Sequence, residues 1–204
     1  ITAEWAVAVF REAKKAGLAT GFVSNGNATP EVLEYLRPWL DLYKVDLKTF
    51  QDKNYRQLGG RLAPVLDSIR QIHAMGFWME IVTLVVPGFN DSDEELTQIA
   101  EFLAGISPDI PWHVTAFHQD YKMTGPDNTP PATLLRAARI GRLAGLHYVY
   151  AGNLPGSLDD LECTRCHRCG RMLVERVGFH VIENRVTPAG NCPHCGATIP
   201  GRWN

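Results

Sequence analysis

The chain has 204 residues, of which 45% are hydrophobic and 21% are charged, as in an ordinary globular protein. Its 20 basic and 22 acidic residues nearly cancel and form no long block of one sign, so neither nucleic acid nor an anionic membrane is indicated as a partner. No apolar run reaches membrane-spanning length and no signal-peptide pattern is present, so we expect a cytoplasmic protein. Because the chain starts with Ile1 rather than Met and enters a helix almost at once, we expect it to be a fragment.

Helices and strands are expected to alternate along the first 150 residues. Helical spacing and capping residues predict helices near 2–16, 30–38, 52–58, 61–75, 92–105 and 129–144. Apolar runs predict strands near 19–24, 41–50, 77–86, 112–117 and 147–150, of which the first reads as a short buried strand. In the first helix, Trp5, Val9 and Ala13 recur at helical spacing, and Ser92 with Glu95 forms a capping box for a later one.

This alternation predicts parallel strands with helices packed outside them. A closed eight-fold barrel needs about 250 residues, whereas these units span about 150. A partial barrel or an open doubly wound sheet therefore fits better. We expect the α/β part to occupy residues 1–150, a linker rich in Gly, Pro and Asp to occupy 151–162, and a small cysteine-rich domain to occupy 163–204.

The segment DLYKVDLKTF (41–50) carries the first candidate site. Asp46 and Lys48 are two residues apart, so a strand would place both side chains on one face. The carboxyl end of an inner strand is where α/β barrels carry out their chemistry. An isolated Asp-x-Lys is more commonly an ion pair without a task, and only the neighbouring motifs favour a functional site.

Other polar residues follow neighbouring strands at the same rim. His118 ends the strand at 112–117, and Ser24, Asn25 and Gly26 end the strand at 19–24. Parallel α/β folds assemble ligand sites from several such strand ends. His113, near the start of its strand, reads as a packed or surface imidazole.

All five cysteines lie in the last fifth of the chain, which indicates a metal site in a reducing compartment rather than a disulfide framework. Two Cys-x-x-Cys-Gly turns, at Cys166/Cys169 and Cys192/Cys195, can bring four thiolates together tetrahedrally. The trailing glycines allow tight turns in which amide groups point at the sulfurs. We predict a zinc ribbon, with hairpin strands near 171–176 and 179–183 around Gly178.

Cys163 leaves an alternative open. The run Cys163-x-x-Cys166-x-x-Cys169 resembles the ligand run of a ferredoxin-type iron–sulfur site. That assignment would leave the thiols of the second turn unpaired, so zinc with Cys163 outside the site is favoured. His167 and His194 lie inside the turns and could replace a ligand, although solvent-facing positions are expected for both.

Taken together, the motifs resemble radical S-adenosylmethionine (SAM) enzymes of the glycyl-radical-activase type. Over the whole chain the closest resemblance is to the radical SAM member of the AmmeMemoRadiSam system. The segments that carry it are SNG (24–26), VDLK (45–48), LVVPGFND (84–91), PWHV (111–114), FH (117–118), YVYAGN (148–153), the cysteine tail and IPGRW (199–203).

The resemblance implies a partial (β/α)6 barrel, lacking its first strand or strands, that binds SAM and a 4Fe–4S cluster at its carboxyl rim. It places Asp46, Lys48 and His118 in contact with SAM, with Ser24 and Asn25 at the family's Thr-Asn-Gly position. A carboxylate suits the SAM ammonium, and a lysine or an amide suits its carboxylate. The family's Cys-x3-Cys-x2-Cys cluster loop is not among these 204 residues, so we expect no catalytic cluster cysteine here and no SAM cleavage by this chain alone.

Two other functions stay open on the sequence. One is a zinc-ribbon adaptor whose α/β part supports a protein contact. The other is a non-radical α/β enzyme that uses Asp46, Lys48 and His118 for acid–base chemistry. The substrate could be a glycine in a partner protein or a small molecule, and the sequence does not indicate an oligomeric state.

Overall fold

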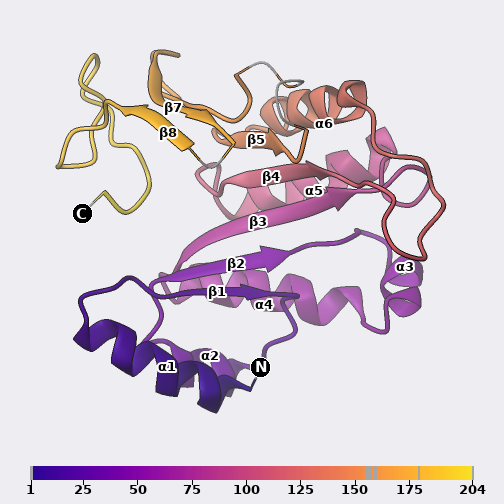
Figure 1. The fold of residues 1–204 in the computed structure, drawn as a ribbon, viewed down its shortest axis with the longest axis horizontal. Coiled ribbons are helices and arrows are strands. Elements are labelled where there is room, and N and C mark those ends of the chain that lie inside the picture. Colours follow the sequence, from indigo (N-terminus) through magenta and orange to yellow (C-terminus); the bar gives the residue numbers. More distant parts are fainter. Residues whose placement is uncertain (1, 155–157, 159, 179, 204) are drawn as a thin grey trace. The chain divides into compact units, whose positions relative to one another are not determined.

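The structure is a computed structural model that describes residues 2–154, 158, 160–178 and 180–203 (Figure 1). The helices in this part of the chain are α1 (Ala3–Lys15), α2 (Pro30–Leu36), α3 (Asp52–Gln57), α4 (Leu62–Ala74), α5 (Asp93–Ile106) and α6 (Pro131–Leu143). The strands are β1 (Gly21–Ser24), β2 (Leu42–Asp46), β3 (Trp78–Val85), β4 (Trp112–Ala116), β5 (Val149–Gly152), β6 (Thr164–Arg165), β7 (Met172–Val177) and β8 (His180–Asn184).

Strands β1 to β5 form one parallel sheet in that order. In the first pair Ser24 lies opposite Val45, and in the second pair Asp46 lies opposite Val82. Each of the five strands follows a helix in the sequence, with the short α3 as an additional helix before α4. The predicted alternation and the α/β fold are therefore confirmed.

The chain divides into two compact units, Ile1–Val82 and Thr83–Asn204, and the division falls inside β3. The predicted division into 1–150, a linker at 151–162 and a domain at 163–204 remains a prediction, and residues 155–157 and 159 of that linker lie outside the described residues.

In the first unit, β2 has one buried and one open face. Tyr43, Val45 and Leu47 are at most 2% exposed, whereas Lys44 is exposed and Asp46 is half-buried. A Cβ atom built on Gly26 would lie 2.8 Å from Val45 Cγ1 and 3.0 Å from Val65 Cγ1 of α4, so Val45 faces α4. In Figure 1, α4 passes behind β1 and β2. We call the opposite side of β1, β2 and the first part of β3 the open face.

The prediction of a buried strand at 19–24 is wrong. β1 is an edge strand that pairs only with β2 among the described strands, and its Val23 side chain is 69% exposed on the open face. The apolar spacing in α1 predicts the helix correctly but not its buried side. Trp5 and Val9 are 71% and 55% exposed, and the residues that pack inward are Ala6 and Val7.

In the second unit, α6 packs against β4 and β5. Trp112 of β4 is fully buried, and its Nε1 donates a hydrogen bond to Thr83 Oγ1 over 3.0 Å. The Ser92 hydroxyl accepts a hydrogen bond from Glu95 N at the start of α5, as the capping box predicts. Thr129 does not cap α6; its hydroxyl accepts from Phe117 N and donates to Val85 O, which fixes the loop between β4 and α6.

The cysteine-rich tail contains a second, three-stranded antiparallel sheet in the order β6-β7-β8. The predicted hairpin around Gly178 is present as β7 and β8, although Phe179 at its turn lies outside the described residues. Every helix that the structure describes is too short or too polar to cross a lipid bilayer.

Candidate functional site

Asp46 and Lys48 lie together at the carboxyl end of β2. Asp46 is the last residue of the strand, and Lys48 Nζ lies 3.0 Å from Asp46 Oδ2. The two side chains are 33% and 40% exposed, so a ligand can reach both. Between them Leu47 is fully buried and donates its backbone N–H to Val82 O, which extends the pairing with β3 beyond the strand end. An ion pair of this exposure contributes little to stability, about 0–1 kcal/mol.

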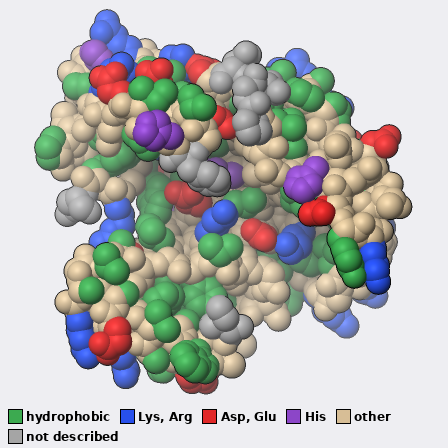
Figure 2. All heavy atoms as spheres, in the orientation of Figure 1, with side chains coloured by type: hydrophobic (Ala, Val, Ile, Leu, Met, Phe, Trp, Pro, Cys, Tyr) green, Lys and Arg blue, Asp and Glu red, His purple; other side chains and the backbone are tan. Residues whose placement is uncertain are grey.

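The open face near this pair is charged. Val23, Lys44 and Glu80 lie in register across β1, β2 and β3, and Asp46 lies one pleat further along β2. Trp78 Nε1 donates a hydrogen bond to Glu80 over 3.1 Å. Figure 2 shows acidic and basic side chains interspersed on the side of the molecule that faces the viewer. Such a surface suits a polar ligand better than an apolar one.

Ser24 and Asn25 lie in the turn that follows β1, where each side chain accepts a backbone hydrogen bond. Ser24 Oγ accepts from Gly26 N over 3.1 Å, and Asn25 Oδ1 accepts from Asn27 N over 3.1 Å. Gly26 has a φ of +75°, which favours glycine, and it packs against Val45 and Val65. The turn therefore has a clear structural role, and contact of Ser24 or Asn25 with SAM remains a prediction.

His118 lies in the second unit, directly after β4. Its ring is exposed, and its Nδ1 lies 3.3 Å from the backbone oxygen of Gln119. The loop that follows is closed by Gln119, whose backbone N–H donates to Asn128 Oδ1 and whose side chain donates to Thr124 O and Pro126 O. The approach of His118 to Asp46 and Lys48 remains a prediction.

Four of the five cysteines converge in the tail. The Sγ atoms of Cys166, Cys169, Cys192 and Cys195 all lie within 4.8 Å of one another. The Cys166–Cys195 and Cys169–Cys192 sulfur distances are 3.6 and 3.7 Å. These are far longer than a disulfide bond of about 2.05 Å. They match the edge of about 3.8 Å expected for a tetrahedron of sulfurs about 2.3 Å from a central zinc ion.

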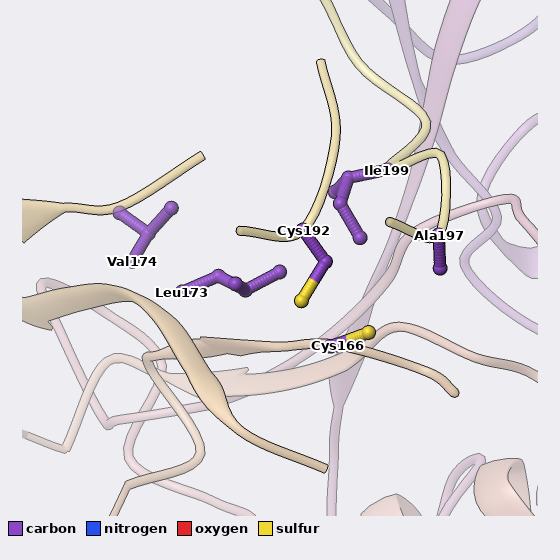
Figure 3. Close-up of a cluster of buried hydrophobic side chains, with 6 residues drawn as sticks. All are labelled: Cys166, Leu173, Val174, Cys192, Ala197 and Ile199. Atoms are coloured by element: carbon purple, nitrogen blue, oxygen red, sulfur yellow. The ribbon is translucent and has the colours of Figure 1, made fainter. Parts of the chain in front are cut away.

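The surroundings of the cysteines also fit a metal. Cys166 and Cys192 are 2% exposed and pack with the apolar residues shown in Figure 3, namely Leu173, Val174, Ala197 and Ile199. Burial opposes ionisation of Cys192, but the backbone N–H groups of His194 and Cys195, together with the neighbouring thiols, lower the pKa of that thiol to about 7. The backbone N–H of Ala197 lowers the pKa of Cys195, but burial and the neighbouring thiols outweigh it and raise that pKa to about 11, so one thiol of this pair ionises at the expense of the other. Amide groups that point at the sulfurs are the arrangement predicted for the Cys-x-x-Cys-Gly turns.

Cys163 lies outside this set of four thiols. Its Sγ accepts a hydrogen bond from Arg176 N over 3.3 Å, which ties it to β7. The geometry therefore supports the zinc-type assignment over the ferredoxin-type run. The identity of the metal remains a prediction, because tetrahedral thiolate sites hold zinc or iron.

A contact that the sequence did not reveal attaches the first cysteine turn to Tyr148, the residue directly before β5. His167 Nδ1 lies 2.9 Å from Tyr148 Oη, and the His167 ring stacks on His147 at a centroid distance of 4.6 Å. His147 Nδ1 in turn lies 2.8 Å from Asp109 Oδ1. Burial, followed by the Asp109 carboxylate, raises the pKa of Tyr148 well above its ordinary value. His167 is exposed, as expected, but it is bonded rather than free.

A second group that the sequence did not reveal lies behind the Asp46–Lys48 pair. Thr49, Asn54 and Tyr55 are polar residues with exposures of 0%, 6% and 4%. Tyr55 Oη accepts a hydrogen bond from Lys48 N over 3.2 Å, and burial raises the Tyr55 pKa. Nothing in the short polar segment 52–58 distinguishes Asn54 and Tyr55 from surface positions.

Comparisons with known proteins support the fold and the family. An uncharacterized protein of Methanocaldococcus jannaschii is 33% identical over 189 residues, which cover 92% of this chain and 56% of that protein. The benzylsuccinate synthase activating enzyme of Thauera aromatica is 29% identical over 137 residues, covering 60% of this chain and 41% of the enzyme. The chain thus spans about half the length of these curated relatives.

The fold has a counterpart among solved structures. A domain of a pyruvate-formate lyase-activating enzyme from Bacteroides vulgatus superposes with a TM-score of 0.64 and 20% identity, covering 74% of this chain and 91% of that domain. The family model described as the Radical SAM superfamily matches residues 2–103, half of the 204 residues, which include β1, β2 and the Asp46–Lys48 pair. The chain therefore belongs to the radical SAM superfamily.

Proposed function

We propose that this chain supplies part of the SAM-binding rim of a radical SAM enzyme. The observation that carries the proposal is the Asp46–Lys48 pair, which stands half-exposed at the carboxyl end of β2 in a chain of this superfamily. Its donor set fits SAM, because the Asp46 carboxylate complements the ligand's ammonium and the Lys48 ammonium complements its carboxylate. In the free protein the two side chains neutralise each other over 3.0 Å, and both would turn to the ligand on binding.

The remaining candidate contacts with SAM are proposals as well. Ser24 and Asn25 would hold the ligand from the turn after β1, and His118 would approach it from the loop after β4. With a 4Fe–4S cluster bound, one electron from the reduced cluster would cleave SAM into methionine and a 5′-deoxyadenosyl radical, which would abstract a hydrogen atom from the substrate. We assign no ligand of that cluster to this chain, because four of its five cysteines meet in the tail and the fifth is bonded to β7.

We further propose that this chain belongs to the AmmeMemoRadiSam subgroup of radical SAM proteins and that its substrate is a glycyl-radical enzyme. Support comes from the relatives named as activating enzymes, among them the Thauera aromatica protein. The substrate would have to reach the open face, where Lys44 is exposed and Asp46 is half-exposed.

For the tail we propose a structural Zn²⁺ bound by Cys166, Cys169, Cys192 and Cys195. Four thiolates complete a tetrahedral shell and leave no position for a reacting group. The apolar cluster of the tail is small, with six buried residues of which two are the cysteines themselves. A bound metal would therefore supply folding free energy that this cluster cannot provide alone.

The SAM proposal is tested by titrating the isotope-labelled chain with SAM and following backbone amide signals. We expect shifts at residues 24–26 and 46–48, and we expect Asp46→Asn to weaken binding at least tenfold, about 1.4 kcal/mol, through loss of a charge-assisted hydrogen bond. Asp67→Asn is the matched control, since Asp67 forms an exposed pair with Arg70 over 2.9 Å on α4. Equal affinity of the Asp46→Asn variant and the unmodified chain would contradict the proposal, as would the absence of saturable binding.

A further inference from the structure

The Asp46–Lys48 pair is supported from behind by the short helix α3. This helix has six residues, and its N-cap residue, Gln51, makes no side-chain capping bond. A helix of this length is not stable by itself. Its buried residues are Asn54 and Tyr55, and both make hydrogen bonds to the two residues that follow Leu47, namely Lys48 and Thr49.

The contacts form a small buried network. Tyr55 Oη accepts from Lys48 N over 3.2 Å, and Asn54 Nδ2 donates to Thr49 Oγ1 over 3.2 Å. Thr49 Oγ1 also accepts from Gln51 N over 3.2 Å. Buried polar groups are costly unless they are bonded, so the side chains of Thr49, Asn54 and Tyr55 have a narrow choice of positions. The network therefore fixes the backbone directly after β2.

The position of the Lys48 backbone determines where its side chain can reach. Asp46 is held by the strand, and Leu47 by its bond to Val82 O. Lys48 lies beyond the strand, where the Tyr55 hydroxyl holds its N–H. A displacement of about 1 Å is enough to impair a binding or catalytic arrangement.

We infer that Tyr55 is a positioning residue for the SAM site, because its hydroxyl holds the Lys48 backbone so that the Lys48 ammonium stays beside Asp46. The role of Tyr55 in SAM binding rests on the proposed function. Tyr55 does not touch the ligand in this scheme and acts only through Lys48. Its carbonyl oxygen also accepts from Gly60 N over 2.8 Å, which closes the turn at the end of α3.

The test uses Tyr55→Phe, which removes a single oxygen atom, in the isotope-labelled chain. We expect the Lys48 amide to exchange with solvent faster than in the unmodified chain, while the Leu47 amide, bonded to Val82 O, keeps its rate. We expect SAM affinity to fall about three- to tenfold, the effect of losing one net hydrogen bond.

Two further variants separate positioning from general loss of stability. Tyr148→Phe removes another buried tyrosine hydroxyl, in the second unit, and should change neither the Lys48 exchange rate nor SAM affinity. Asn54→Leu removes the neighbouring bond to Thr49 but keeps the Tyr55 hydroxyl, so it should release the Thr49 hydroxyl from Asn54 while α3 stays in place and the Lys48 amide stays protected. If Tyr55→Phe fails to fold, a Lys48 amide that stays protected in Asn54→Leu supports the inference, and one that loses protection overturns it.

The outcomes distinguish this inference from the proposed function. Unchanged SAM affinity in Tyr55→Phe, with Asp46→Asn still weakened, would overturn the positioning role and leave the SAM site intact. Absence of SAM binding by the unmodified chain would overturn the proposed function and, with it, the positioning role. An unchanged Lys48 exchange rate in Tyr55→Phe would overturn the inference whatever the SAM result.

Discussion

Gly141 in α6 offers a sharp test of the packing in the second unit. A Cβ atom at this position would lie 2.9 Å from Trp112 Cε3 and 2.9 Å from Val149 Cγ2. Both neighbours belong to strands, β4 and β5, and they are 0% and 4% exposed. The Gly141→Ala variant therefore requires the helix to move away from the sheet or the Trp112 ring to shift.

The size of the effect follows from two opposing terms. Alanine is favoured over glycine inside a helix by about 1 kcal/mol. Overpacking a closed core costs about 1–3 kcal/mol. We expect the upper part of that range, because Trp112 Nε1 is bonded to the fully buried Thr83 hydroxyl and the ring cannot move without stretching that bond. The net loss of stability is then about 1–2 kcal/mol, or about 2–8 °C in Tm for a chain of this size.

The assay is thermal and urea unfolding of Gly141→Ala beside Gly105→Ala. Gly105 lies near the end of α5, and a Cβ atom there would meet nothing within 4 Å. The Gly105→Ala control should therefore gain the higher helix propensity of alanine without any steric cost, and its Tm should rise by about 1–3 °C. A Gly141→Ala variant as stable as the unmodified chain, or more stable, would refute the close packing of α6 on Trp112 and Val149.

Two other predictions concern the cysteine-rich tail and Tyr148, which contacts it through His167. Removal of the metal by a chelator, or the Cys192→Ser variant, should abolish binding of one zinc equivalent and raise amide exchange in β7. The Cys163→Ser variant should keep the metal, because Cys163 lies outside the four thiols. Elemental analysis and exchange measurements check both expectations, and metal loss in Cys163→Ser would contradict the assignment. Burial raises the Tyr148 pKa, so the folded protein keeps this hydroxyl neutral at a pH at which the unfolded chain already loses its proton. The contribution of Tyr148 to the free energy of unfolding is therefore retained below about pH 10. It falls above that pH by at most about 1.4 kcal/mol per pH unit. Unfolding free energies measured from about pH 8 to about pH 11 should show a shallower decline in Tyr148→Phe, and equal slopes would contradict the burial of this hydroxyl.

Local patterns in the sequence were sufficient for much of the fold. The alternation of elements, the Ser92 cap and the two cysteine turns are encoded by residues close together in the chain, and the structure has all three. The burial of β1 was not predictable in this way. Whether an apolar strand such as β1 is central or at an edge depends on the order of strands in the sheet, which is a property of distant segments.

The candidate site shows the same distinction. The Asp46–Lys48 contact follows from their spacing, and the structure brings the two side chains together. Tyr55 and His167 were missed because their roles depend on partners that only the fold supplies, Lys48 across the turn before α3 and Tyr148 next to β5. A tyrosine in a polar helix and a histidine between two cysteines carry no local signal of these bonds.

The two-sided character of β2 has a consequence for how this protein can diverge. A change at Val45 disturbs the contact with Gly26 and α4, whereas a change at the adjacent Lys44 alters a solvated side chain at small energetic cost. Successive positions along one strand are thus under different selective constraints. Relatives can acquire new ligand preferences through every second residue while the hydrophobic packing behind them is inherited unchanged.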